Sequence, residues 1–212
     1  MYCPGSFRQD DAETQKALIR QYPLGTIFTS VNGLEANAIP FLLVQDEAGV
    51  RLQAHIARAN PQLAAFRQAC EVLVVFYGPD AYVTPSWYPS KQLDGKQVPT
   101  WNYTMIQVKG KVAVMDDPQW VYDQIQRLSI RQESGRAEPW AVTDAPADYI
   151  ETQMKAIIGI EIVVDEVKGK YKLSQNRSQT DFQGVVTGLQ ADGQAEMAEY
   201  MTRHGRKPSS LT

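Results

Sequence analysis

The chain has very few of the residues on which metal sites and disulfide frameworks depend. Its 212 residues include two cysteines, Cys3 and Cys70, and two histidines, His55 and His204. Neither cysteine belongs to a C-x-x-C pair or to a Cys/His cluster, which argues against both a zinc site and a disulfide framework. We therefore expect no metal ligands.

Long apolar runs and familiar catalytic motifs are also missing. No run of about 18 apolar residues occurs, and the N-terminus lacks the basic-then-apolar pattern of a signal peptide. We therefore expect a cytoplasmic protein with no membrane association. The sequence contains no P-loop, no Rossmann glycine fingerprint and no G-x-S-x-G element. An enzymatic activity would need a cofactor to supply the chemistry, and whether the chain is an enzyme stays open.

Positive charge is not in excess. The formal net charge is −3, which argues against an overall electrostatic attraction to nucleic acid. A short basic run, Arg203 to Lys207, follows a predicted helix, and such a run is usually a solvated helix end. DNA is therefore a partner that the overall charge does not support. Hydrophobic residues make up 43% of the chain, which is ordinary for a globular protein.

Alternation of apolar and polar residues predicts an antiparallel sheet. Strands are expected over 24–31 and 34–44, joined at the hairpin signal Asn32-Gly33, and then over 50–57. Pro40 removes a ladder donor, which indicates an edge, a bulge, or a backbone that faces something other than a neighbouring strand, such as a flavin ring. Further apolar strands are expected over 71–78, 105–115 and 158–174. Six or seven strands with helices at their ends predict a small antiparallel barrel, mainly β with peripheral helices (α+β).

Capping residues predict the helices. Asp10 with Glu13 predicts a capping box for a helix that ends before Pro23. Asn60-Pro61 predicts a helix that runs to about residue 69, and Asp117-Pro118 predicts a longer one. Two more helices are expected, over 148–157 and over 192–204, the second with Asp192 as its cap and Gly205 at its end.

The stretch QAHIARANPQL offers a candidate anion site. Within six residues it presents His55, Arg58 and Asn60 at the expected start of a helix. Free backbone N–H groups and the helix dipole favour an anion there, and a guanidinium suits phosphate. The alternative is that Asn60 only caps the helix, Arg58 is a surface charge and His55 is a satisfied residue of the barrel.

Two Pro-flanked segments carry Trp with Tyr, around Trp87 and around Trp101 to Tyr103. They would suit stacking on a planar heterocycle, a dimer interface, or packing of a lid on the barrel, and the sequence leaves these open. The segment from Lys170 to Arg177 alternates cationic and amide side chains. It suits a phosphate or an acidic substrate, and equally a solvated basic rim.

The segments MYCPGSFRQDD, AHIARANPQ, GPDAYVTPSWY, VPTWNY and KYKLSQNR, in this order, closely resemble the PaiB-type family. Its members are described as FMN-binding negative transcriptional regulators, and the family is similar to the flavin split-barrel group of pyridoxamine phosphate oxidases and flavin reductases. The resemblance implies a six-stranded antiparallel Greek-key split barrel over residues 1–189. Residues 190–212 would form a C-terminal helix and a basic tail.

The resemblance also implies a homodimer with FMN in a groove between two subunits. The region around His55 would face the phosphate, the strand from Asn37 would follow the flavin ring, and the tryptophans would come from a barrel edge or the partner chain. One departure is visible, because residues 36–42 contain no basic residue where the wider group has a phosphate-binding arginine. The expected FMN contacts are Asn37, Ile39, Pro40, Phe41, His55, Ala57, Arg58, Asn60, Trp87, Trp101, Asn102, Tyr103 and Lys172.

The sequence thus predicts an FMN-binding homodimer of the PaiB-type family that acts as a negative regulator of transcription. The alternative is an FMN-dependent oxidoreductase of unknown small-molecule substrate. A third hypothesis is a non-catalytic dimer that binds a planar ligand or another protein. No residue is assigned a catalytic role.

Overall fold

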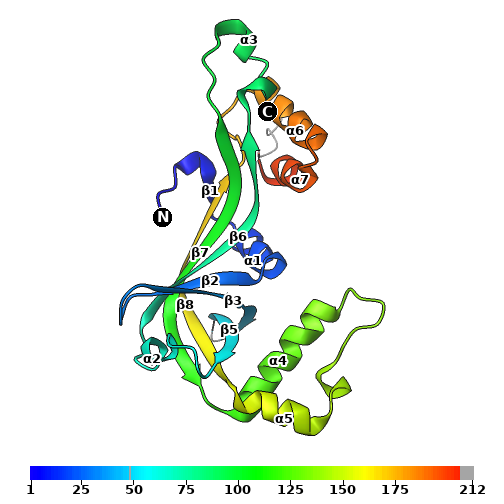
Figure 1. The fold of residues 1–212 in the computed structure, drawn as a ribbon. Coiled ribbons are helices and arrows are strands. Elements are labelled where there is room, and N and C mark those ends of the chain that lie inside the picture. The colour runs from blue at the N-terminus through cyan, green and yellow to red at the C-terminus, as the bar shows by residue number, and fades with distance from the viewer. Residues whose placement is uncertain (48, 206–212) are drawn as a thin grey trace. The chain divides into compact units, whose positions relative to one another are not determined.

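A computed structural model describes residues 1–47 and 49–205. Within this part of the chain, eight strands form one sheet of order β3-β2-β6-β7-β8-β5-β4, and β1 pairs with β8 (Figure 1). The strands are β1 (Arg8–Gln9), β2 (Leu24–Thr29), β3 (Glu35–Pro40), β4 (Leu42–Asp46), β5 (Gly49–Ala57), β6 (Glu71–Val83), β7 (Thr100–Met115) and β8 (Ile157–Lys172).

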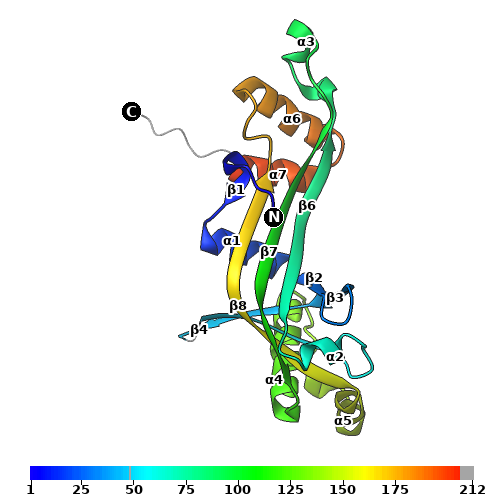
Figure 2. The same cartoon turned by 90° about the vertical axis from the view of Figure 1, so that its left-hand side faces the viewer.

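The described residues also form helices, labelled in Figures 1 and 2. The α-helices are α1 (Ala12–Gln21), α2 (Leu63–Phe66), α3 (Lys91–Asp94), α4 (Pro118–Glu133), α5 (Ala147–Lys155), α6 (Gln179–Ala191) and α7 (Ala195–His204). Three 3-10 helices are η1 (Gly5–Phe7), η2 (Pro85–Trp87) and η3 (Val142–Asp144).

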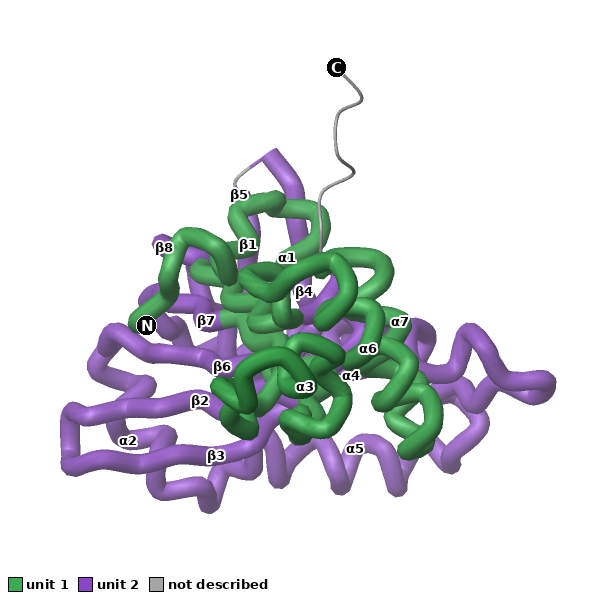
Figure 3. Tube along the Cα trace, turned by 90° about the horizontal axis from the view of Figure 1, so that it is seen from above, with its two compact units in different colours: residues 1–15, 77–106, 168–212 green, residues 16–76, 107–167 purple. Residues whose placement is uncertain are grey.

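The chain forms two compact units (Figure 3). Unit 1 consists of residues 1–15, 77–106 and the segment from residue 168 onward, and unit 2 consists of residues 16–76 and 107–167. The long strands β6, β7 and β8 contribute residues to both units, since three of the four unit boundaries fall inside these strands and the fourth falls inside α1.

Unit 2 contains the predicted barrel strands. The β2–β3 hairpin pairs Leu24 with Pro40 and Thr29 with Glu35, and Gly33 in its turn has φ 108°. The hairpin signal is therefore confirmed. A second antiparallel hairpin joins β4 and β5, and β5 pairs with β8. The sheet order begins at β3 and ends at β4, although these two strands follow one another directly in the chain.

Phe41 separates β3 from β4. Its backbone N–H donates to the carbonyl oxygen of Pro23 at 2.8 Å, and its buried ring meets Phe76 edge-on with centroids 5.8 Å apart. Pro40 cannot donate to a ladder, so the single strand expected over 34–44 breaks there and its two halves pair with different partners. This break and the two-residue β1 raise the strand number to eight, compared with the six expected. The class, mainly antiparallel β with helices, is confirmed.

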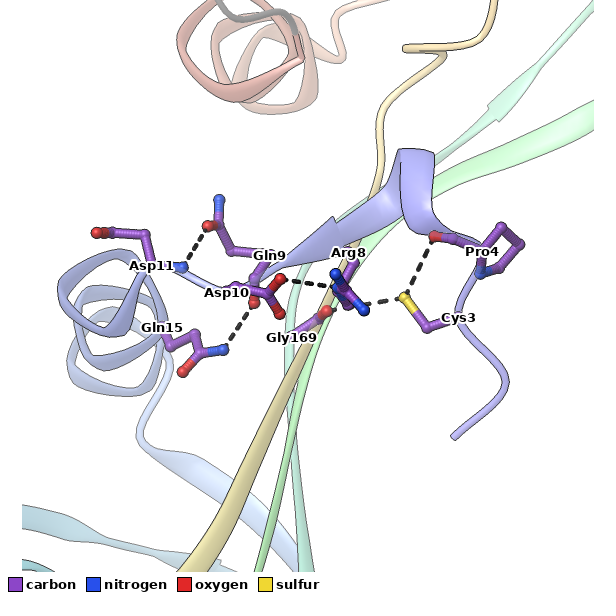
Figure 4. A network of polar contacts seen from close by, with 8 residues as sticks. All are labelled: Cys3, Pro4, Arg8, Gln9, Asp10, Asp11, Gln15 and Gly169. Atoms are coloured by element: carbon purple, nitrogen blue, oxygen red, sulfur yellow. Dashed lines mark hydrogen bonds and ion pairs between the residues drawn. The ribbon is translucent and has the colours of Figure 1, made fainter.

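In unit 1 the N-terminal segment is attached to β8 (Figure 4). Arg8 and Gln9 pair with Lys170 and Gly169 of that strand. A Cβ on Gly169 would lie 2.7 Å from the backbone oxygen of Gln9, so only glycine allows this close approach. The side-chain amide of Gln15, on α1, donates to the same oxygen of Gln9 at 2.6 Å.

The helix starts are partly as predicted. Asp117 accepts from the backbone N–H of Gln119 at 3.0 Å and caps α4 as expected. The cap of α1 is Asp11, which accepts from Thr14 N–H at 2.8 Å, and the prediction of Asp10 was wrong. Asp10 instead accepts a charged hydrogen bond from Arg8 at 2.7 Å, which takes it away from the helix (Figure 4).

Two other helix predictions were wrong. The helix expected from Asn60 to about Ala69 is only the four-residue α2, and Ala69 has a left-handed φ of 50°, which no helix accommodates. The helix α6 was not predicted, and Asp192, expected to start α7, is the C-cap of α6. Gly205 does end α7. The basic run predicted from Arg203 to Lys207 extends beyond the described residues.

Candidate functional site

The residues predicted to contact FMN fall into the two units. Unit 2 holds Asn37, Ile39, Pro40, Phe41, His55, Ala57, Arg58 and Asn60, and unit 1 holds Trp87, Trp101, Asn102, Tyr103 and Lys172.

In unit 2 a buried amide joins two of the predicted residues. The side chain of Gln62 is fully buried. Its oxygen accepts from Asn37 Nδ2 at 3.0 Å, its nitrogen donates to Thr29 Oγ1 at 3.0 Å, and its backbone N–H donates to Asn60 Oδ1 at 3.0 Å. Asn37 of β3 and Asn60 of the loop after β5 are therefore held together. Sequence analysis had treated Gln62 as an ordinary helix residue.

The predicted core residues of this strand do not present side chains to a ligand. Ile39 and Phe41 are buried in the core of unit 2, while Pro40 is exposed. β3 stands at one end of the strand order, with β2 as its neighbour. A ligand beside β3 would therefore meet backbone groups of the strand's outer edge rather than these apolar side chains.

His55 lies against α4. Its Nδ1 is 2.8 Å from Oε1 of Gln124, a fully buried residue of that helix. Two residues earlier on the same face of β5, Gln53 accepts from Arg127 of α4 at 2.8 Å. Because alternate residues of a strand share a face, the polar face of β5 packs under α4. The structure thus brings His55 to α4, whereas Asn60 joins Asn37.

A cationic corner follows β5. Arg58 donates to Asp116, between β7 and α4, at 2.5 Å. The hydrogen bond from Arg58 holds the pKa of Asp116 below its ordinary value, and the positive charges of Arg58 and Arg67 lower it further. Two guanidinium groups thus act on this carboxylate, and the exposed carboxylate of Asp117 follows it directly in the chain. We call Arg58, Arg67 and Asp116 the arginine corner.

Arg67 is the residue that sequence analysis missed. It lies nine positions after Arg58, on the other side of α2, and is exposed. A turn-like α2 of four residues returns the chain toward β7, whereas the predicted longer helix would have treated Arg67 as one of its surface charges. Because α2 is so short, its dipole contributes little to anion binding, and an anion here would have to be bound by the arginine side chains.

The arginine corner fits the phosphate end of a nucleotide cofactor. Guanidinium groups donate in a planar fork that matches phosphate oxygens. The side-chain oxygen of Asn60 is used by Gln62, which leaves its amide hydrogens as further donors among the described residues. The donors of the arginine corner are thus the two guanidinium groups, whereas the amide of Asn60 belongs to the Gln62 network.

A separate cavity in unit 2, of about 380 Å³, does not fit a phosphate. Its lining includes three carboxylates, Glu71, Asp165 and Glu166, with Lys109 as the cation. Lys109 Nζ lies 3.6 Å from Glu166 Oε2, so its charge is already engaged. The surplus of negative charge would repel an anion.

In unit 1, Trp87 and Asn102 are packing residues. A Cβ on Gly188 of α6 would lie 2.3 Å from the Trp87 ring, and one on Gly184 would lie 2.1 Å from the Trp87 backbone oxygen. The glycine pair at i, i+4 gives α6 a flat face for Trp87. Asn102 is fully buried and accepts from Ser174 Oγ at 3.1 Å.

Trp101, Tyr103 and Lys172 lie on a more exposed face of unit 1. Trp101 is 53% exposed and meets Tyr82 edge-on, with ring centroids 5.9 Å apart. Lys172 Nζ donates to Thr100 Oγ1 at 2.5 Å and to the backbone oxygen of Trp101. Burial lowers the pKa of Lys172, and nearby positive charges lower it further.

Among residues 1–47 and 49–205, no group of three or more His, Cys, Asp or Glu side chains could hold a metal ion. In the same part of the chain, no helix combines the length and the apolar character needed to cross a membrane.

Comparison with known proteins gives a family and a fold. Residues 1–166 match the family described as "Putative FMN-binding domain". The chain is 30% identical to the Bacillus subtilis protein named Protease synthase and sporulation protein PAI 2 over 205 residues, which cover 95% of this chain and 96% of that protein. It is 35% identical to an uncharacterized protein of Emericella nidulans over 228 residues, which cover 90% of each.

A solved structure shows the same fold. The FAD and heme binding protein from Mycobacterium smegmatis superposes with a TM-score of 0.58 at 18% identity, and covers 78% of this chain and 73% of that chain.

Proposed function

Because the chain belongs to the FMN-binding domain family, we propose that unit 2 holds FMN with its phosphate at the arginine corner. Both the resemblance to the PaiB-type family and the flavin cofactor expected from it are confirmed by the family match and by the PAI 2 relative. The site residues stay a prediction, and the structure changes which of them we favour.

One observation carries the proposed site. Arg58 and Arg67 both act on the carboxylate of Asp116, and Arg58 donates to it at 2.5 Å, so the corner already holds an oxygen anion with the groups that a phosphate needs. Arg58 is about one-third exposed at its side chain, so its guanidinium is accessible to a ligand. Bound FMN would supply one- and two-electron redox chemistry.

The residues of this chain would orient the cofactor. The Gln62 network holds Asn37 of β3 and Asn60 in fixed positions. The outer edge of β3 and the loop after β5 therefore keep a fixed arrangement within unit 2. A preorganised donor set loses less entropy on binding.

The test is retention of FMN by variants of the corner. Arg58→Ala and Arg67→Ala should each lower FMN affinity about tenfold or more, because a hydrogen bond to a charged group contributes about 1.5–3 kcal/mol. Arg203→Ala is the matched control, since Arg203 is an exposed arginine that also pairs with a carboxylate, Glu199. Affinity is measured by titrating flavin fluorescence.

Asp116→Asn separates phosphate binding from a structural role of the ion pair. If Arg58 binds phosphate, removal of the competing carboxylate leaves FMN affinity equal or higher. If the pair with Asp116 only supports the fold, Asp116→Asn and Arg58→Ala weaken retention equally. Equal retention by the Arg58 and Arg203 variants would refute the site.

We further propose that the protein acts as a homodimeric negative regulator of transcription. Support comes from the PAI 2 relative, whose name assigns it to protease synthesis and sporulation and whose whole length this chain matches. Salt-sensitive, sequence-selective retention of duplex DNA would support this role. Bleaching of bound flavin by NADH or NADPH without such retention would favour the oxidoreductase alternative.

A further inference from the structure

The parts of β6, β7 and β8 in unit 1 have one covered face and one open face. Residues of the covered face contact α7: Asn102 donates to the sulfur of Met201 at 3.2 Å, and Tyr171 meets the ring of His204 at 5.6 Å. Figure 1 shows α6 and α7 on the same side of these strands. By the alternation of a strand, the neighbouring residues Trp101 and Lys172 belong to the other face.

The open face carries a row of aromatic rings. Tyr82 of β6 and Trp101 of β7 are 47% and 53% exposed and lie edge-on to each other. Tyr103, two residues along β7, shares their face. β6, β7 and β8 are neighbours in the sheet, so these rings form one surface across adjacent strands. Exposed Trp and Tyr side chains in such a row are typical of a binding surface.

Positive charge runs beside the rings on β8. Lys170 Nζ lies 5.2 Å from the centroid of the Tyr103 ring and 5.8 Å from that of Tyr2. Lys172 donates to two uncharged oxygens, a hydroxyl and a backbone carbonyl. The like charges of Lys170 and Arg177 act on Lys172. The field at these lysines is thus positive, although exposed Asp80 of β6 adds one negative charge to the same face by alternation.

We propose that this open face binds single-stranded nucleic acid, with bases on Tyr82, Trp101 and Tyr103 and phosphates at Lys170 and Lys172. An aromatic ring stacks on any unpaired base, and cations beside the rings follow the backbone. A duplex keeps its bases stacked on each other, so it would meet only the cations. The inference rests on the regulatory part of the proposed function, to which it adds the form of nucleic acid and the surface.

The test uses the full chain and a fluorescein-labelled mixed-pyrimidine oligodeoxynucleotide of about 12 nucleotides, within the usual range of site sizes. Fluorescence anisotropy is recorded at several salt concentrations, for the single strand and for its duplex. The single strand should bind more tightly, and the logarithm of its association constant should fall with log salt at a slope of about −1.4, since two cations contribute about 0.7 each.

Variants assign the binding to residues. Trp101→Ala should weaken binding about tenfold, as loss of one stacked base predicts. Its control is Trp140→Ala, another exposed tryptophan, which belongs to unit 2. Lys170→Gln should reduce the salt slope by about 0.7, whereas Lys96→Gln, an exposed lysine of the loop after α3, should leave it unchanged.

Each other outcome overturns the inference in a distinct way. Equal affinity for single strand and duplex, or equal effects of the two tryptophan variants, would remove the stacking surface. Binding of the duplex without binding of the single strand would support the proposed regulatory role but refute single-strand binding by this face. Displacement of the oligonucleotide by FMN would show that the face binds the flavin. If sedimentation shows that Trp101→Ala changes a dimer to a monomer, the face binds a second copy of the chain.

Discussion

Replacement of Gln62 by leucine tests whether a buried amide network holds unit 2 together. Leucine has a similar volume but removes the bond that Asn37 donates and the bond that Thr29 accepts, both 3.0 Å long. Each such bond contributes about 0.5–1.5 kcal/mol, and a buried hydroxyl left without a partner costs about 1–3 kcal/mol. Thr29 is 4% exposed, so water cannot replace the lost bond there. The free energy of unfolding should fall by about 2–4 kcal/mol.

Urea unfolding measures this loss, with the slope m unchanged because the exposed surface is the same. Gln68→Leu is the matched control: it makes the same change in the same segment, but at an exposed residue whose side-chain amide donates to the Ala64 oxygen at 3.3 Å. It should change the free energy by no more than about 0.5 kcal/mol. Adding Thr29→Val to Gln62→Leu should cost less than the sum of the single changes, since both partners are then apolar.

Equal shifts of the urea midpoint for the Gln62 and Gln68 variants would show that the network carries little energy. Strict additivity of the Gln62 and Thr29 changes would show that these two side chains do not interact in solution. Either result would also remove the argument that Asn37 and Asn60 are preorganised for a cofactor.

Two further changes test the packing and the pH dependence of unit 1. Gly188→Ala places a Cβ 2.3 Å from the Trp87 ring and should destabilise the fold by about 1–3 kcal/mol in urea unfolding, whereas Gly135→Ala, with open space around it, should not. Burial lowers the pKa of His204 below its ordinary 6.5. The unfolded chain therefore binds the proton more readily, so stability is lost as the pH falls below about 6.5. His204→Phe, which keeps a ring against Tyr171, should remove this part of the loss between about pH 8 and pH 5, and an unchanged pH profile would contradict it.

The strands were predictable because their signals are local. Asn32-Gly33 lies in the turn between Thr29 and Glu35, as its hairpin signal indicates, whereas the strand expected over 34–44 is two strands that are interrupted at Phe41. What the sequence could not show is that the two halves pair with different neighbours, because pairing over long separations is decided by packing. The helix α6 escaped notice for a related reason: its glycines, at 184 and 188, weaken a helical pattern, and only the packing of Trp87 explains them.

The candidate site was less predictable than the fold. His55, Arg58 and Asn60 follow one another closely in sequence, yet alternation along β5 and the turn after it direct them to different partners: Gln124, Asp116 and Gln62. No sequence motif marked Arg67 as a site residue, because its place beside Asp116 depends on α2 ending after four residues. A run of donors in sequence predicts a shared ligand only if the backbone keeps them on one face.

The exposure of each predicted residue now decides which variants can test the flavin site. Trp87 and Asn102 are fixed by packing in unit 1, so loss of flavin after their replacement would follow from instability as readily as from a lost contact. Arg58 and Trp101 are accessible and support little of the core, so their replacement changes binding without a large change in folding. A flavin site built by both residues would lose affinity in both variants. If only the Arg58 variant loses flavin and only the Trp101 variant loses single-stranded DNA, the two units carry separate binding functions.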